Sequence, residues 1–196
     1  MKKLKKLYDW VLHWAHTPYG VPALFGISFA ESSFFPVPPD VLQIALSISR
    51  PAKSFYYALV SSIASVLGGM AGYGIGLFLM DLLGWPVLHF YGLETKYEMV
   101  RELFHKYDAW AVAIAGFTPI PYKLFTIASG AFGISFGVFV IASVLSRSAR
   151  FFLVATLIYF YGRPIKDFID KYFNLLTFAF FALLIGGFVA IKYLMH

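Results

Sequence analysis

Residues 34–40 read FFPVPPD, and residues 117–123 read FTPIPYK. Each stretch interrupts an apolar segment with prolines and carries one charged residue, Asp40 or Lys123. A proline inside a helix removes a backbone hydrogen bond and clashes with the preceding turn, so both segments are expected to break here. The breaking residues are Pro36, Pro38, Pro39, Pro119 and Pro121.

The composition of this 196-residue chain indicates a membrane protein. Hydrophobic residues make up 60%, aromatic residues 20% and charged residues only 13%. A soluble domain of this length has no use for so much apolar surface. The net charge is +6, but its lysine cluster at residues 2–6 lies beside apolar segments, which indicates membrane orientation and not nucleic-acid binding. The chain has no cysteine, which excludes disulfides and thiolate metal sites.

Three uninterrupted segments are long enough to cross a bilayer: Phe55–Met80, Phe136–Tyr161 and Leu175–Leu194. The two interrupted segments, 21–48 and 109–132, are too short on either side of their prolines to cross. Each is therefore predicted to form a re-entrant helical hairpin that enters and leaves on one side, the alternative being a kinked spanning helix. Irregular backbone at membrane depth persists only inside protein or along a wet cavity, so the breaks mark a candidate transport pathway.

The two breaks also align with each other 83 residues apart, which places Pro36 and Pro38 over Pro119 and Pro121. Each unit then consists of one hairpin followed by one spanning helix. Because a unit crosses the membrane an odd number of times, the second unit is expected to be inverted relative to the first. Inverted repeats of this kind build transport sites near the middle of the bilayer.

The predicted fold is a single all-α integral membrane domain over residues 1–196. Basic residues concentrate near the N-terminus, at Arg50 and Lys53, and at 163–171, whereas 94–108 carries more acids than bases. This bias places the N-terminus in the cytoplasm and leaves the side of the C-terminus open. The expected parts are an interfacial helix 1–18, repeat one 21–80, interfacial linker helices 82–108, repeat two 109–162 and a C-terminal transmembrane helix 174–194.

Ionisable residues inside membrane segments are costly and are therefore functional candidates. Arg147 and Arg150 lie three residues apart, on one helical face, and a guanidinium matches a phosphate with two parallel hydrogen bonds. We predict that Arg147, Arg150 and Lys123 bind an anionic or phosphate-bearing headgroup, and that Glu31 and Asp40 exchange protons. The alternative is internal ion pairing, in which the two acids only neutralise the two arginines.

Both interpretations hold together if a carboxylate and a phosphate compete for the same arginines. Burial favours the neutral form of an acid and a neighbouring arginine favours its ionised form, so the sequence leaves proton coupling open.

No catalytic or metal centre is expected in this chain. It contains no G-x-S-x-G turn, and His13 and His16 lack a third metal ligand. Gly68, Gly72 and Gly76 recur every fourth residue, a spacing typical of close helix packing in membranes. The sequence thus predicts a protein that is not an enzyme and has no cofactor.

The ordered motifs also resemble a known family. Glu31, the first break, GYGIG at 72–76 and FTPIPYKLFTIASG at 117–130 together resemble the DedA family, also called the SNARE-associated or VTT-domain family, over about Val21–Gly162. The resemblance is closest to the short bacterial branch with the FTPIP-type motif. It implies two re-entrant hairpins, a multi-pass protein of the bacterial inner membrane, and a role in lipid homeostasis. Some relatives act as flippases for undecaprenyl phosphate or phosphatidylethanolamine, eukaryotic relatives act as scramblases, and several depend on the proton motive force.

The resemblance supports Glu31 and Asp40 as the acidic pair and Lys123 as the basic residue after the second break. An arginine usually precedes the second motif's proline, where this chain has Thr118. We expect Arg147 and Arg150 to supply that charge from the next helix, which leaves the lipid unspecified.

The expected function is movement of a phospholipid or a polyprenyl phosphate, as a flippase or scramblase, with protons as a second partner. The alternatives are a small-ion transporter and a structural protein of membrane homeostasis. The sequence is compatible with a homo-oligomer and fixes neither the oligomeric state nor the direction of movement.

Overall fold

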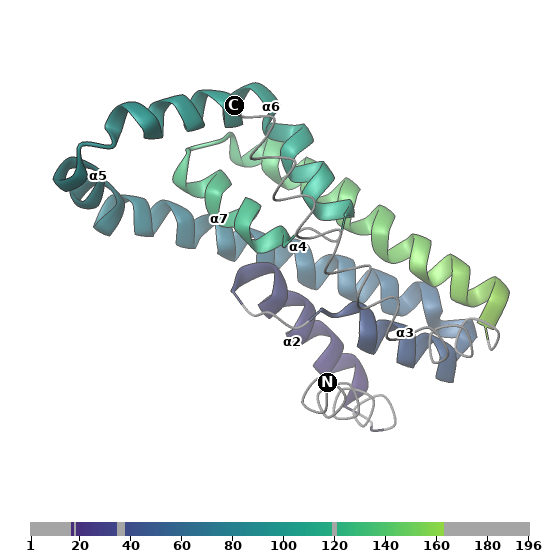
Figure 1. The fold of residues 1–196 in the computed structure, drawn as a ribbon. Coiled ribbons are helices and arrows are strands. Elements are labelled where there is room, and N and C mark those ends of the chain that lie inside the picture. Colours follow the sequence, from purple (N-terminus) through teal and green to yellow (C-terminus); the bar gives the residue numbers. More distant parts are fainter. Residues whose placement is uncertain (1–16, 18, 35–37, 119–120, 163–196) are drawn as a thin grey trace, which may run out of the picture.

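The computed structural model describes residue 17 and residues 19–34, 38–118 and 121–162, and all regular structure within them is helical (Figure 1). This confirms the predicted all-helical class. The predicted helices 1–18 and 174–194 lie outside the described residues, residue 17 excepted. The described elements are α2 (Gly20–Ser33), α3 (Asp40–Ser49), η1 (Pro51–Lys53), α4 (Ser54–Leu79), η2 (Met80–Gly84), α5 (Trp85–Tyr91), α6 (Glu94–Phe117), α7 (Tyr122–Ala131) and the helix Phe136–Gly162.

Both predicted breaks interrupt the helices. α2 ends at Ser33 before α3 begins at Asp40, and α6 ends at Phe117 before α7 begins at Tyr122. Pro36 and Pro119 themselves lie outside the described residues. The backbone around the second break shows the expected effect of proline, because Thr118 is extended with φ −84° and ψ 169°. A residue that precedes a proline is driven out of the helical region in this way.

The first long apolar helix extends beyond the predicted Phe55–Met80. Helical structure continues without interruption from Pro51 to Tyr91, through α4, η2 and α5. The added length contains Pro86, which a regular α-helix does not accommodate. A π-helical turn, η2, precedes it, and the Trp85 N–H donates to the Met80 carbonyl five residues back. The helix ends at Gly92, whose positive φ of 60° suits glycine.

The structure also differs from the prediction at the start of repeat two. α6 runs as one helix from Glu94 to Phe117, so the boundary placed between residues 108 and 109 falls inside it. The sequence changes from polar to apolar at Ala109, but no proline or glycine occurs between residues 94 and 115. A change from polar to apolar residues changes whether a helix faces water or an apolar environment, but it does not break the helical backbone. The predicted surface helix and the predicted first arm of the second hairpin are therefore one element.

α4 is the central helix, and α2 and α7 pack along it where it carries glycines (Figure 1). A Cβ added to Gly68 would overlap the Phe29 backbone, and one added to Gly76 would overlap the Ile127 backbone. The glycine spacing therefore serves close helix packing, as predicted. α2 runs parallel to α4, because Leu24 clusters with Tyr57 near the start of α4 whereas Phe29 lies against Gly68.

The pair α2–α3 returns toward the Ser54 end of α4. Leu42 and Leu46 of α3 belong to the same cluster as Leu24 and Tyr57. The pair α6–α7 instead returns toward the Leu79 end of α4. There the Tyr97 hydroxyl of α6 donates a hydrogen bond to the carbonyl of Ala131, the last residue of α7. The two interrupted segments thus approach the middle of α4 from opposite ends.

Helix 136–162 runs antiparallel to α4. Phe136 and Phe139 pack on Tyr73, with ring centroids 5.3 and 5.2 Å apart, and farther along Tyr159 packs on Phe55 at 5.3 Å. The described residues contain two helices long and apolar enough to cross a membrane, Pro51–Tyr91 and Phe136–Gly162.

Large apolar side chains remain exposed on the outer faces of both long helices. On α4, Leu59, Ile63 and Leu67 form a stripe at helical spacing, and on helix 136–162 Leu145 is 66% exposed. A stripe of this kind suits contact with lipid.

Candidate functional site

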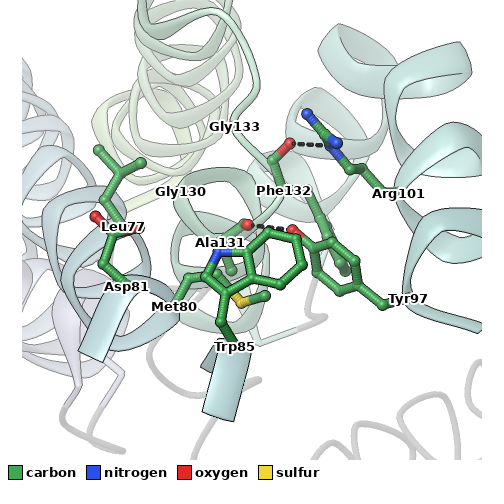
Figure 2. Close-up of a pocket in the computed structure, with 10 residues that line it drawn as sticks. All are labelled: Leu77, Met80, Asp81, Trp85, Tyr97, Arg101, Gly130, Ala131, Phe132 and Gly133. Atoms are coloured by element: carbon green, nitrogen blue, oxygen red, sulfur yellow. Dashed lines mark hydrogen bonds between the residues drawn. The ribbon is translucent and has the colours of Figure 1, made fainter. Parts of the chain in front are cut away.

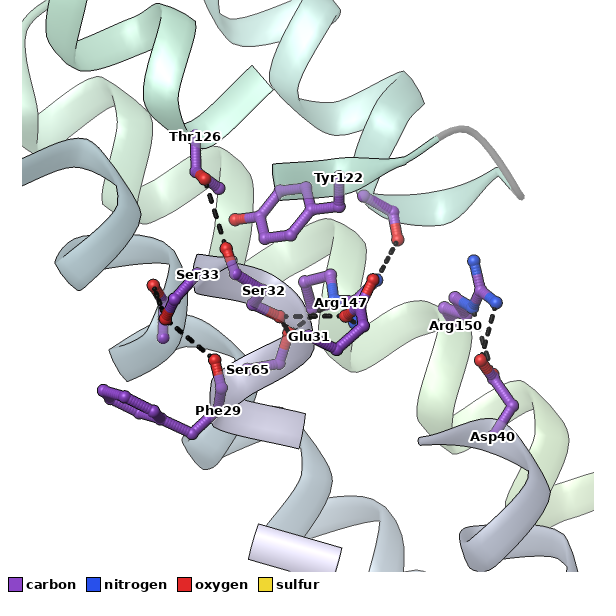
Figure 3. A network of polar contacts seen from close by, with 12 residues as sticks. Phe29, Glu31, Ser32, Ser33, Asp40, Ser65, Tyr122, Thr126, Arg147 and Arg150 are labelled. Carbon is purple, nitrogen blue, oxygen red and sulfur yellow. Dashed lines mark hydrogen bonds and ion pairs between the residues drawn. The ribbon is translucent and has the colours of Figure 1, made fainter. Parts of the chain in front are cut away.

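The tips of the two interrupted segments meet beside the middle of α4. The Thr126 hydroxyl of α7 donates to the Ser32 carbonyl near the end of α2, at 3.2 Å (Figure 3). The end of α6 reaches the same region, because Gly116 lies against the side chain of Ser146. Residues from both breaks, from α4 and from helix 136–162 therefore surround one small volume of the protein.

Arg147 of helix 136–162 pairs with Glu31 of α2 inside this volume. Nη2 of Arg147 lies 2.9 Å from Oε2 of Glu31 (Figure 3). The arginine side chain is only 2% exposed and the glutamate 17%. Arg147 Nε donates to the Ser65 hydroxyl at 2.6 Å, and Ser32 donates to Oε2 of Glu31 at 3.1 Å. The ion pair is therefore tied to both α2 and α4.

Two aromatic rings enclose the Arg147 guanidinium. Its central carbon lies 4.8 Å from the ring centroid of Tyr122 and 4.8 Å from that of Phe151. Planar guanidinium groups stack well on aromatic faces. The Tyr122 hydroxyl donates to Ser143 at 2.6 Å, which fixes the ring against the cation. Arg147 is consequently held in one orientation by pairing, hydrogen bonding and stacking together.

Arg150 pairs with Asp40 at the other side of the tips. Nε and Nη2 of Arg150 approach Oδ1 and Oδ2 of Asp40 at 3.2 and 2.8 Å, which is a two-pronged contact. The third donor, Nη1, bonds the Thr118 carbonyl at 2.8 Å. The two side chains are 21% and 19% exposed, so this pair is the more accessible one. Its guanidinium therefore lies beside Thr118, the residue that follows α6.

The structure brings four of the five predicted charged site residues into pairs: Glu31, Asp40, Arg147 and Arg150. This is the arrangement of the internal-pairing alternative. The two arginines, predicted to share one anion, each contact a different carboxylate. Lys123 lies in the first turn of α7, one residue after Tyr122, and is half-buried. Binding of a headgroup or a proton at any of these residues stays a prediction.

Sequence reasoning did not single out three residues of this site, Ser65, Tyr122 and Phe151. Tyr122 belongs to the second proline motif, so the motif itself carried a signal for it. Ser65 lies one turn before Gly69 on the small-residue face of α4, where a polar contact between close helices is expected. Phe151 follows Arg150 in an apolar helix, and nothing in its local sequence distinguishes it.

A shallow pocket lies elsewhere, at the Leu79 end of α4. It measures about 180 Å³ and is lined by the end of α4, by η2, α5 and α6, and by the end of α7 with the two residues after it (Figure 2). Within it, Arg101 Nε donates to the Phe132 carbonyl at 3.2 Å and the Tyr97 hydroxyl to the Ala131 carbonyl at 2.8 Å. Burial raises the pKa of Tyr97, which keeps its hydroxyl a donor. None of the predicted site residues lines this pocket, so it is not the candidate site.

Residues 37–160 match the model of the VTT domain, the domain of the DedA family. The chain belongs to the VTT-domain family. The matched range contains Asp40, both arginines and the whole second break, and Glu31 lies six residues before it. VTT-domain proteins are membrane proteins, which agrees with the two long apolar helices.

Relatives in this family cover most of the chain. An uncharacterized protein of Haemophilus influenzae is 38% identical over 157 residues, covering 80% of this chain and 81% of that protein. An uncharacterized homologue from Histophilus somni is 35% identical over 163 residues, covering 83% and 85%. An uncharacterized protein of Methanocaldococcus jannaschii is 29% identical over 133 residues, covering 67% and 79%. No solved structure matches the chain.

Proposed function

We propose that this protein moves an anionic or phosphate-bearing lipid headgroup across the bacterial inner membrane. The observation that carries the proposal is the pair of buried arginine–carboxylate contacts where the two helical breaks meet. Charges are expensive in a membrane interior and persist where they serve a pathway. Guanidinium groups are also the side chains best suited to a phosphate. No bond is made or broken in this process, so the protein acts as a transporter and not as an enzyme.

The proposed cycle is an exchange of anions on the two arginines. With no substrate, Asp40 occupies Arg150 and Glu31 occupies Arg147. A headgroup phosphate that enters would replace a carboxylate on the same guanidinium, and protonation of that carboxylate would remove the competing charge. Arg150 is the entry point in this scheme, because it is 21% exposed whereas Arg147 is 2% exposed. Lys123, at the start of α7, would add positive charge near the second break.

We further infer that α2–α3 and α6–α7 are re-entrant hairpins in an inverted repeat. The return of one pair to the Ser54 end of α4, and of the other to the Leu79 end, supports this arrangement. Arg50 and Lys53 lie at the Ser54 end, and the positive-inside bias places that end in the cytoplasm. Alternating access would then expose the ion pairs first to one side and then to the other.

The topology is testable because the chain has no cysteine of its own. Single cysteines at Tyr19, Lys53, Lys106 and Ser135 are to be labelled in cells with a thiol reagent that does not cross membranes. Re-entrant hairpins require the first two positions to react from the cytoplasm and the last two from outside. If the two members of either pair react from opposite faces, the corresponding segment spans the membrane and the inverted repeat is refuted.

The transport proposal is tested in proteoliposomes with lipids labelled on the headgroup. Accessibility of the label to a quencher added outside reports movement, measured for phospholipids and for a polyprenyl phosphate, with and without a pH gradient. Arg150→Gln should lose movement, whereas Arg101→Gln, which breaks the exposed pair with Glu98, should retain it. Equal movement in protein-free liposomes, for every lipid tried, would refute the proposal.

The closed ion pairs favour a second candidate, a structural protein whose charges only stabilise the fold. Exchanging the acid and the arginine of one ion pair distinguishes the two candidates. The Asp40–Arg150 pair suits this experiment because it is the more exposed of the two. With Asp40→Arg and Arg150→Asp combined, a structural role is restored, because the pair re-forms with opposite polarity. Transport is not restored, because the guanidinium at the proposed entry point then lies on α3 and not on helix 136–162. A small-ion transporter would show ion flux in the same liposomes without movement of lipid.

A further inference from the structure

Five buried polar atoms have no hydrogen-bond partner among the described residues. Each belongs to a side chain that is 0% exposed. Buried hydroxyl and amide groups are almost always paired, so several exceptions in one protein require an explanation. The atoms are Ser28 Oγ, Gln43 Oε1, Ser47 Oγ, Ser54 Oγ and Ser61 Oγ. We refer to these five residues as the polar file.

Two members of the polar file, Ser28 and Ser61, lie one helical turn from residues that contact the Arg147–Glu31 pair. The hydroxyls of Ser32 and Ser65, which both contact that pair, are 2.6 Å apart (Figure 3). Ser28 lies one turn before Ser32 on α2, and Ser61 lies one turn before Ser65 on α4. Because α2 and α4 run parallel, one step back on each helix brings Ser28 and Ser61 into the next layer toward the Ser54 end.

Two further members continue the file from the Asp40–Arg150 pair along α3. Gln43 and Ser47 follow Asp40 at three and seven residues, on the same helical face. Gln43 Nε2 donates to the Phe151 carbonyl at 2.9 Å, one residue after Arg150, while its Oε1 stays unpaired. α3 runs back toward the Ser54 end, so Ser47 lies farther from the ion pairs than Gln43.

Ser54 is the member of the polar file at the end away from the ion pairs. It begins α4, next to Arg50 and Lys53, which are exposed. Eleven residues separate Ser54 from Ser65, which corresponds to about 16 Å along the helix axis. The residues with unpaired atoms therefore lie between the ion pairs and the Ser54 end of α4.

Three buried hydroxyls of α7 and helix 136–162 differ from the polar file. Thr126, Ser129 and Ser143 are also 0% exposed, and each hydroxyl donates to a carbonyl, those of Ser32, Phe125 and Phe139 respectively. In a helix, a serine hydroxyl readily donates a hydrogen bond to the backbone carbonyl four residues before it. The serines of the polar file make no such bond among the described residues. Their hydroxyls remain available to another partner on one side of the ion pairs only.

We propose that the polar file binds a row of ordered water molecules that hydrates the two ion pairs from the Ser54 end alone. Buried waters occupy sites where two to four polar groups converge, and hydroxyls and an amide oxygen supply both donors and acceptors. The charged groups at the inner end of the row are Glu31, Asp40, Arg147 and Arg150. The presence of water does not depend on what the protein transports. Its use as a proton route to the two acids rests on the proposed transport function.

The test measures water access directly, in the full-length protein in lipid. Ser28→Cys, Ser47→Cys and Ser61→Cys each introduce one thiol into a chain without cysteine, with little change of volume. Ser129→Cys and Ser143→Cys are matched controls, equally buried in α7 and helix 136–162. After transfer to D₂O, infrared spectroscopy follows conversion of each S–H group to S–D, which requires contact with water. We expect exchange at least tenfold faster at the file positions than at the controls.

Each result decides the matter. Fast exchange at the file and slow exchange at the controls supports the row of water. Exchange at the file as slow as at the controls overturns it, and so does fast exchange at all five positions, because no one-sided row then exists. Ser54→Cys replaces any file variant that fails to fold. The measurement needs no transport activity, so its outcome is separate from that of the liposome assay.

Discussion

Replacing Glu31 by an apolar residue should lower the free energy of unfolding far more than the same replacement of an exposed acid. In the Glu31→Met variant, Arg147 keeps its charge and its 2% exposure but loses the carboxylate at 2.9 Å. Removing one partner of a buried pair typically costs about 3–5 kcal/mol, because the other charge is left uncompensated. Glu31 is itself 17% exposed, so water offsets part of the loss and we expect a value near the lower limit. For a chain of this size, 3 kcal/mol lowers the unfolding midpoint by roughly 6–12 °C.

The same substitution at the surface provides the control. Glu98 pairs with Arg101 at 3.3 Å, but the two side chains are 48% and 40% exposed. Exposed pairs contribute at most about 1 kcal/mol, so Glu98→Met should change stability little. The assay is unfolding in mixed micelles, by heat and by titration with a denaturing detergent, followed by far-UV circular dichroism.

A double variant gives the sharper comparison. Combining Glu31→Met with Arg147→Met removes both charges and leaves a flexible apolar side chain at position 147, next to the rings of Tyr122 and Phe151. Methionine packs well against aromatic rings, and replacing a buried pair by apolar groups is often neutral. The double variant should therefore be more stable than Glu31→Met alone. The reasoning is refuted if Glu31→Met is no less stable than Glu98→Met, or if the second substitution destabilises the protein further.

Three other predictions concern transport and packing. Arg147→Lys should leave the protein folded but lower headgroup movement at least tenfold, because lysine keeps the charge and loses the planar fork; full activity in the liposome assay would contradict direct binding. Asp40→Asn should flatten the pH dependence of movement if Asp40 carries the proton, whereas an unchanged pH profile would exclude that role. Gly68→Ala should disrupt the α2–α4 contact and lower the thermal midpoint, since its Cβ would overlap the Phe29 backbone. Gly74→Ala, where nothing lies within 4 Å, should instead stabilise α4 by about 0.5–1 kcal/mol, and equal effects at the two glycines would refute the packing argument.

The sequence predicts the features of this fold that depend on local chemistry. The prolines predict the positions of both helix breaks, because a proline disrupts helical backbone within one turn of its own position. Hydropathy placed helix 136–162 almost to the residue, as Phe136–Tyr161 against the observed Phe136–Gly162. The same reasoning separated residues 108 and 109 because polarity changes there, but α6 continues through them, since polarity sets surroundings and not backbone continuity.

The site required information that a single sequence lacks. Charge alone allowed Glu31 and Asp40 to pair with either arginine, or both arginines to face one ligand. The choice of partner depends on the arrangement of helices 110 or more residues apart in sequence, as the Asp40–Arg150 bond shows. The enclosure of Arg147 depends likewise on Tyr122 and Phe151, which come from different elements. Such contacts follow from tertiary packing, for which local sequence carries no signal.

Charge balance at the convergence of the two breaks constrains any transport that occurs there. The two arginines and two carboxylates sum to zero, which is why four charges are tolerated together in an apolar surrounding. An entering headgroup with one negative charge would bring these four side chains and the headgroup to −1, unless one carboxylate took up a proton or Lys123 supplied the balancing charge. If Lys123 stays outside this group, the proposed binding of one such headgroup is favoured together with one proton. A zwitterionic headgroup adds no net charge, so the same site would accept it without a proton, and dependence on a pH gradient would follow the net charge of the lipid.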